Sequence, residues 1–226
     1  YNTEVYDTCP FDNIWDLTRP EWRSKVLFPD PNILSEFVEV LGAIVQHPEE
    51  MAAAYEEEFG EPLVLSPGVE NAGYEWIKRL LDNDAIIVRS TNDVSNAVGA
   101  AGQESPPVGM TAFSRLRDRD KDPSLVFDVA YDIKPVMGVT TNVVVLIVNR
   151  APHPNAAKLL VRWMLGDEEG GWGYAPYFVV GNIPSRTDVP APPGTKTLEE
   201  MNTWQVDPDF VWYEGLKIKD FWLLMQ

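Results

Sequence analysis

The chain has 226 residues, 45% hydrophobic and 23% charged, so it can bury a core and does not have the composition of a disordered protein. With 35 acidic against 18 basic residues, its formal net charge of −17 disfavours nucleic acids and anionic membranes as partners, but not a small anion held by local amide groups. The single cysteine, Cys9, excludes an intramolecular disulfide, and no stretch approaches the roughly 20 apolar residues of a membrane span.

The first part of the chain predicts strands alternating with helices. Residues 25–29 are typical of a short buried strand, and a proline-rich turn follows. Apolar residues at helical spacing predict a helix over 34–45, with Asn32 or Ser35 as its N-cap. A second helix should begin at Pro48 and end at Gly60. The next elements in order are a helix over 74–81, a strand at 85–88 and a helix through Asn96 and Val98.

The second part continues this alternation. A short strand is predicted at 107–110, and the charged stretch 115–121 is interpreted as a solvated face. Residues 125–130 predict another strand, and the unbroken apolar run 143–148 predicts a strand buried on both faces. A helix over 154–166 should pack its apolar side, and two short helices close the chain. The alternation indicates an α/β fold with parallel or mixed sheets.

Candidate ligand contacts lie at two predicted strand-to-helix turns. In open α/β sheets, ligands bind beyond the carboxyl ends of the strands, near helix N-termini that attract anions. The first such turn contains Asn32, and the second contains Ser90, Thr91 and Asn92. These residue types are equally typical of simple helix capping, so both interpretations stand at this point.

The sequence nominates no catalytic, metal or cofactor site. His47 and His153 each precede a proline at a predicted helix start and lack companions at metal-ligand spacing. A glycine-rich phosphate loop and a nucleophile elbow are both missing from the sequence. We therefore expect a protein without enzymatic activity and without a cofactor.

Four segments carry a resemblance to a known family. They are 13–31 (NIWDLTRPEWRSKVLFPDP), 151–160 (APHPNAAKLL), 181–189 (GNIPSRTDV), and 206–210 (VDPDF) followed by 219–222 (KDFW). In this order they resemble the iron(III)-type extracellular solute-binding proteins of ABC importers. The resemblance covers nearly the whole chain, although no single motif decides it.

The resemblance implies a type 2 periplasmic-binding-protein fold with two lobes of mixed sheet flanked by helices. In this family roughly a hundred residues precede the segment that matches Tyr1, a size consistent with one lobe. Residues 1–138 would form the second lobe, and 139–190 would return to an incomplete first lobe after a crossover near Gly138 to Asn142. Residues 191–226 would pack back on the second lobe. The chain is thus expected to be a fragment with an open site.

One departure from the family bears on the ligand. Iron-binding members carry adjacent tyrosines after the strand equivalent to 107–110, and their phenolates suit ferric ion, a hard cation. This sequence has Thr111, Ala112, Phe113 and Ser114 there, and no two of its tyrosines are adjacent. The chain is therefore more similar to the branch that binds phosphorylated sugars or similar anions.

That resemblance implies ligand contacts from the turn residues named above. The expected set is Asn32, Ser90, Thr91, Asn92, Thr111, Ala112, Ser114 and Asp132. Asp132 would accept hydrogen bonds from sugar hydroxyls, or it is only a turn residue at a strand end.

The resemblance also implies where the protein works and with what. We expect a monomeric binding protein, periplasmic or extracellular and lipid-anchored if its N-terminal region carries an anchor, that delivers its solute to a membrane permease. The alternatives are a ferric-ion binder with other ligands, an enzyme acting on a phosphorylated metabolite, and a sensor receptor on the same fold.

Overall fold

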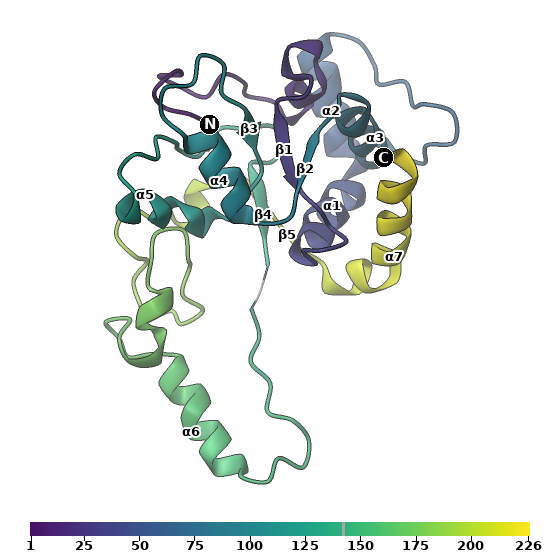
Figure 1. Cartoon of the computed structure of the whole chain (residues 1–226). Coiled ribbons are helices and arrows are strands. Elements are labelled where there is room, and N and C mark those ends of the chain that lie inside the picture. The colour runs from purple at the N-terminus through teal and green to yellow at the C-terminus, as the bar shows by residue number, and fades with distance from the viewer. Residues whose placement is uncertain (142) are drawn as a thin grey trace. The chain divides into compact units, whose positions relative to one another are not determined.

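A computed structural model describes residues 1–141 and 143–226 (Figure 1). The chain forms two compact units, one made of Tyr1–Thr141 with Met201–Gln226 and the other of Asn142–Glu200. The expected lobe divisions at residues 138 and 190 stay predictions, and the expected crossover includes residue 142, which lies outside the described residues. Among the described helices, none has the length and apolar character that crossing a membrane requires.

The first unit contains a three-stranded parallel sheet in the order β2-β1-β3. Leu27 in the central strand pairs with Ile86 on one side and with Gly109 on the other. All four residues of the central strand are buried, as is typical of an apolar strand in a parallel sheet that is covered on both faces. Three of the predicted strands are thereby confirmed, with the bounds β1 (Val26–Pro29), β2 (Ile86–Val88) and β3 (Val108–Gly109).

Helices of the first unit begin and end at the residues that the capping signals indicate. Pro48 is the first residue of α2, and Gly60 ends it with a φ of 72°, a conformation that glycine adopts without strain. The Asn71 side chain accepts a hydrogen bond from the Tyr74 amide at the start of α3. Ser35, not Asn32, is the N-cap residue of α1. The bounds are α1 (Glu36–Gln46), α2 (Pro48–Phe59), α3 (Ala72–Asp82) and α4 (Thr91–Gly99).

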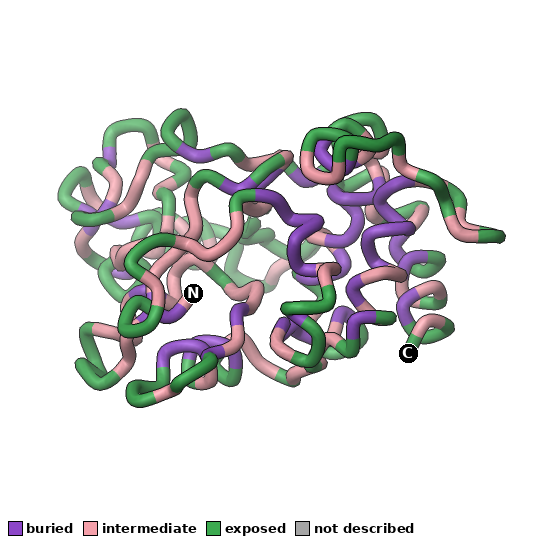
Figure 2. The backbone as a smooth tube through the Cα atoms, turned by 90° about the horizontal axis from the view of Figure 1, so that it is seen from above, coloured by how far each residue is buried: buried purple, intermediate pink, exposed green. Residues whose placement is uncertain are grey.

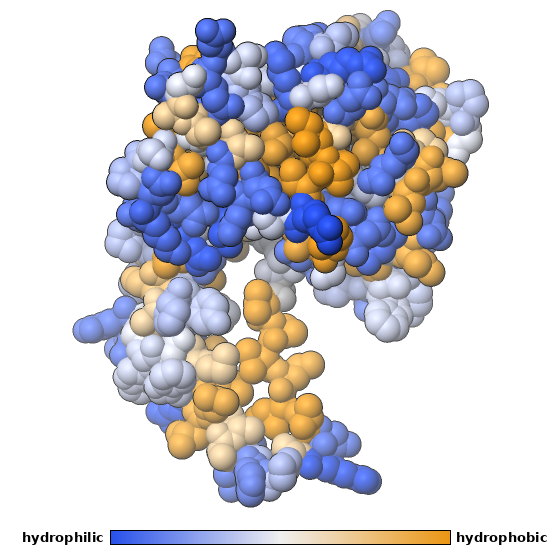
Figure 3. Space-filling model, in the orientation of Figure 1, coloured by the Kyte–Doolittle hydropathy of each residue, from blue (hydrophilic) through white to orange (hydrophobic). Residues whose placement is uncertain are grey.

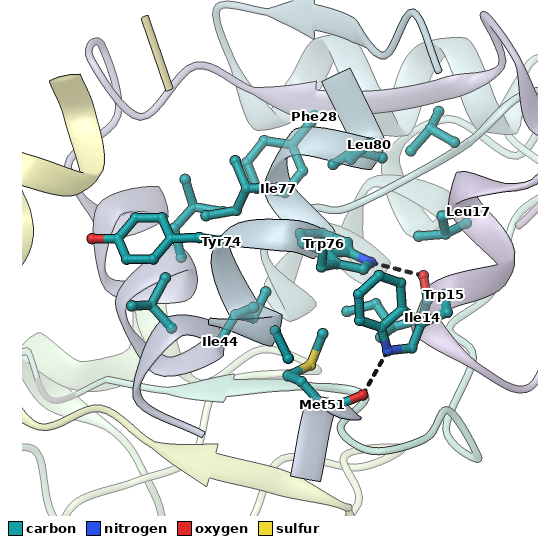
Figure 4. Close-up of a cluster of buried hydrophobic side chains, with 14 of the residues drawn as sticks. Ile14, Trp15, Leu17, Phe28, Ile44, Met51, Tyr74, Trp76, Ile77 and Leu80 are labelled. Atoms are coloured by element: carbon teal, nitrogen blue, oxygen red, sulfur yellow. Dashed lines mark hydrogen bonds between the residues drawn. The ribbon is translucent and has the colours of Figure 1, made fainter. Parts of the chain in front are cut away.

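Buried aromatic residues form the centre of the first unit (Figure 4). Trp15, in the 3-10 helix η1 (Ile14–Thr18), donates its indole N–H to the Met51 carbonyl at 2.8 Å. Trp76 donates likewise to the Ile14 carbonyl at 3.0 Å. Each buried indole thus ties one segment of the unit to another. Figure 2 shows the buried residues gathered where the helices near the C-terminus lie side by side.

The C-terminal segment completes the first unit. β4 (Gly138–Thr140) pairs in parallel with β5 (Thr203–Gln205), a pairing that the sequence did not predict. The last element is one helix, α7 (Pro208–Met225), which packs against α1 and α3. The expectation of two short closing helices is therefore wrong for this segment. The Asp207 side chain caps the helix start, and Pro208 continues into an unbroken helix of 18 residues.

The second unit contains helices but no described strand. α6 (Pro154–Met164) forms where predicted, and Gly166, with a φ of 76°, follows it. However, α6 has no fully buried residue. Ala157, Val161 and Met164 are half-buried and the helix contacts Trp172–Tyr177, whereas Leu160 is exposed, so the expected packing of its apolar side is only partly confirmed. The remaining elements are the 3-10 helices η4 (Trp172–Tyr177) and η5 (Leu198–Glu200).

Two predicted strands are absent from the described residues. Residues 143–148 lie outside every strand, and their side chains are 39–94% exposed (Figure 3). A buried strand needs a paired neighbour, and the described part of this unit supplies none beside the run. Residues 125–130 form only an isolated antiparallel bridge between Phe127 and Asn2, because the partner segment turns away at once.

Candidate ligand-binding site

The carboxyl ends of the three parallel strands meet at one edge of the sheet. The Asp30 amide, just beyond β1, donates to the Val88 carbonyl at the end of β2 at 2.9 Å. On the other side, the Met110 amide donates to the Leu27 carbonyl of β1 at 3.0 Å. The segments that follow the strands therefore start side by side, and they contain Asn32, then Ser90, Thr91 and Asn92, and then Thr111.

The turn after β2 begins α4 with a capping bond. The Ser90 hydroxyl accepts a hydrogen bond from the Asp93 amide at 3.2 Å, so the capping interpretation of this residue is confirmed. The Thr111 hydroxyl donates to the Thr91 carbonyl at 3.1 Å. The structure thus brings together two candidate residues that come from different strand ends.

Asn92 contacts an arginine that the sequence reasoning missed. The Arg115 guanidinium donates to the Asn92 side-chain oxygen and, at 3.4 Å, to the Asp118 carboxylate. Arg115 lies in the 3-10 helix η3 (Phe113–Arg117), which packs against α4. The interpretation of 115–121 as a solvated face is therefore only partly right, since Arg115 is half-buried and the exposed residues begin at Asp120.

The same stretch carries unsatisfied donors. The Nε atoms of Arg115 and Arg117 are buried and have no hydrogen-bond partner among the described residues. Unpaired donors of a charged group are costly, and an acceptor near them would be stabilised. The available sequence signal was only the concentration of three arginines, at positions 115, 117 and 119, within five residues.

The remaining candidate residues, Asn32, Ala112, Ser114 and Asp132, have fewer contacts with the group formed by Ser90, Thr91, Asn92 and Thr111. Asn32 is exposed, and its backbone and side-chain amides donate to the Asp30 carboxylate at 2.9 and 3.2 Å. Ala112 is exposed at the start of η3, and Ser114 is half-buried within it. Asp132 is exposed. Its neighbour in the chain, Tyr131, packs its ring edge-on against Phe113 of η3, with 5.8 Å between the ring centroids.

Two hollows elsewhere contain none of these residues. One of about 290 Å³ in the first unit is lined by Thr18, Arg19, Pro20, Phe59, Arg79, Asp82 and Asn83. One of about 490 Å³ in the second unit is lined by Arg162, Gly166, Asp167, Glu168, Glu169, Trp172 and Arg186. The candidate residues therefore lie outside both of these hollows.

A group of three carboxylates, Asp12, Asp16 and Glu58, lies beside Arg19, which pairs with two of them. Their oxygen atoms lie within 4.8 Å of one another, and Arg19 pairs with both Asp16, at 2.7 Å, and Glu58. Burial, opposed by the Arg19 hydrogen bond and assisted by Asp16, raises the pKa of Glu58 above its ordinary value. The Arg19 guanidinium therefore offsets the charge of two of the three carboxylates.

Comparison with known proteins identifies the fold. No protein-family model and no curated protein matches the sequence. The structure is similar to the crystal structure of iron-bound HitA from Pseudomonas aeruginosa, with a TM-score of 0.67 and 16% sequence identity. The match covers 98% of this chain and 65% of the HitA chain, so the chain spans about two thirds of that protein's length. The predicted α/β fold with parallel strands is confirmed.

Proposed function

We propose that this chain belongs to a solute-binding protein that captures a small anionic solute, such as a phosphorylated sugar, and delivers it to the membrane permease of an ABC importer. The likeness to the HitA fold supports a binding protein without catalytic activity. The observation that carries the ligand class is the grouping of Ser90, Thr111, Asn92 and Arg115 at the carboxyl edge of the sheet.

Local chemistry allows this acidic chain to bind an anion. The N-terminus of α4 presents free backbone N–H groups and the positive end of the helix dipole. Arg115 and Arg117 add two guanidinium groups with unpaired buried Nε donors in the segment packed against that helix. A phosphate oxygen can accept several such hydrogen bonds at once, whereas the net charge of −17 is spread over the whole surface.

Calorimetric titration with inorganic phosphate, a hexose phosphate and a phosphonate tests this proposal. Arg115→Gln, and separately the double variant Thr91→Ala with Asn92→Ala, should each weaken binding about 5- to 150-fold, which corresponds to about 1–3 kcal/mol for a lost charge-assisted hydrogen bond. Wild-type protein that binds none of the three anions would contradict the proposal.

Asn71→Ala is the matched control. Asn71 caps α3 as Ser90 caps α4, but it lies at a different helix start. Its replacement should lower the free energy of unfolding by about 1 kcal/mol and leave anion affinity unchanged. Equal losses of affinity in the control and the site variants would mean that the residues act only as caps.

A second candidate ligand is ferric ion, which the likeness to iron-bound HitA favours. One phenol close to the candidate residues is that of Tyr131, whose ring lies against Phe113 of η3. Burial, assisted by Asp128, raises the pKa of Tyr131 and so opposes the phenolate that iron requires. A visible charge-transfer band on adding ferric citrate, lost in Tyr131→Phe, would support iron over the anion alone.

A further inference from the structure

Two arginines of the first unit, Arg89 and Arg117, are unpaired among the residues that the structure describes. Neither forms an ion pair or a hydrogen bond there, and the Nε of Arg117 is buried. Every other arginine of the unit pairs with a carboxylate; these are Arg19, Arg23, Arg79, Arg115 and Arg119. In a chain with 35 acidic and 18 basic residues, an arginine without an acidic partner is unexpected, and its charge is available to a ligand.

Both arginines lie in segments that adjoin α4. Arg89 is exposed and lies between the end of β2 and the N-cap residue of α4. Arg117 is the last residue of η3, which packs against α4 and is tied to its first turn by the bond from Arg115 to Asn92. The amides of Thr91 and Asn92, the first two residues of α4, have no intrahelical partner. Unpaired cations and free amide donors therefore adjoin one helix.

Carboxylates at this edge of the sheet limit how much negative charge a ligand can carry. Asp93, in the first turn of α4, is exposed, and Asp30 lies just beyond β1, so both oppose an anion. Arg115 is already shared with the Asp118 carboxylate, at 3.4 Å. The helix start supplies the equivalent of about half a positive charge. A second negative charge on a ligand therefore needs a further cation, and Arg89 is the exposed one.

We propose that Arg89 determines which anions the site takes, by pairing with the second negative charge of a phosphate monoester. The site then selects doubly charged anions over singly charged anions of the same shape. This inference rests on the proposed function, because it assumes that an anion binds at the start of α4. A phosphate monoester carries nearly two negative charges above its second pKa of about 6, whereas a sulfate monoester carries one. The guanidinium of an arginine forms a charge-assisted pair with such an oxoanion, and both of its hydrogen bonds strengthen as the charge rises.

Calorimetric titration with glucose 6-phosphate and glucose 6-sulfate at about pH 8 tests the proposal, because the two esters have the same shape and differ by about one charge. The wild type should bind the phosphate about tenfold or more tightly than the sulfate. Arg89→Gln should weaken phosphate binding about tenfold or more and sulfate binding much less, so that the two affinities approach each other. Arg89 is exposed and unpaired among the described residues, so this variant should keep the far-UV circular dichroism of the wild type.

Arg23→Gln is the matched control. Arg23 is exposed and precedes β1, so it lies at the amino ends of the parallel strands, opposite to the edge where Arg89 follows β2. The variant changes the net charge by the same amount, and both affinities should stay as in the wild type. Asp93→Asn tests the same charge effect with the opposite sign, and it should tighten phosphate binding more than sulfate binding.

The outcomes separate this inference from the proposed function. A wild type that binds neither ester contradicts both. A wild type that binds the sulfate as tightly as the phosphate, or more tightly, overturns the inference and leaves a site for anions standing. So does a preference for phosphate that Arg89→Gln leaves unchanged, since another residue then meets the second charge. Equal losses for both esters in Arg89→Gln also overturn it, because the residue then does not distinguish charge.

Discussion

Two buried tryptophans of the first unit should respond differently to the same substitution. Trp76 and Trp222 are both 0% exposed, and both rings lie against Phe28, at 6.5 and 5.2 Å between centroids. The Trp76 indole N–H donates to the Ile14 carbonyl at 3.0 Å, whereas the Trp222 N–H has no partner among the described residues. Replacing each by phenylalanine removes an indole N–H that is satisfied in one case and unsatisfied in the other.

The magnitude follows from two contributions. The void of roughly 40 Å³ costs about 1 kcal/mol at about 24 cal/mol per Å³, and this cost is common to both variants. Trp76→Phe also strands the buried Ile14 carbonyl, which costs about 1–3 kcal/mol more. Trp222→Phe instead removes a buried unpaired donor and regains a similar amount. The free energies of unfolding should therefore differ by about 2–6 kcal/mol, with Trp222→Phe as stable as the wild type or up to about 2 kcal/mol more stable.

Urea denaturation followed by far-UV circular dichroism measures this difference, provided that the slopes with denaturant agree between variants. Trp15→Phe is the control, because the Trp15 indole donates to the Met51 carbonyl at 2.8 Å and its loss should resemble that of Trp76→Phe. Equal destabilisation by Trp76→Phe and Trp222→Phe would refute the reasoning, since ring volume alone would then account for both.

Two further predictions concern the packing of α3 and the start of α7. In Gly73→Ala the new Cβ would lie 2.4 Å from the Ile44 carbonyl oxygen of α1, so the free energy of unfolding should fall by about 1–3 kcal/mol despite the better helix propensity of alanine. Gly138→Ala, with nothing within 4 Å of its Cβ, should be tolerated in the same denaturation assay. Hydrogen bonds from the Phe210 amide and Gln46 lower the pKa of Asp207, so its stabilisation is complete above the ordinary Asp pKa of about 3.9 and is lost as pH falls through the lower folded value. Asp207→Asn should flatten the dependence of Tm on pH below about pH 4, and curves parallel to the wild type would contradict this.

Part of the candidate site follows from sequence alone. Strand-to-helix turns at the carboxyl ends of parallel strands are local features, so Ser90, Thr91 and Thr111 could be nominated from their neighbours along the chain. Arg115 could not, because its contact with Asn92 depends on how η3 packs against α4. Side-chain contacts between segments far apart in sequence are set by packing and leave no local pattern.

The fold divides in the same way. Helix starts and ends such as Pro48 and Gly60 were predictable, because φ preference and the missing proline N–H act within one turn of the chain. The pairing of β4 with β5 joins residues more than 60 positions apart, and only the tertiary structure decided it. The run 143–148 shows this most clearly, because its apolar composition indicates only a tendency to be buried away from water. Whether they are buried depends on which strands lie beside them, and a sequence of apolar residues carries no information about those neighbours.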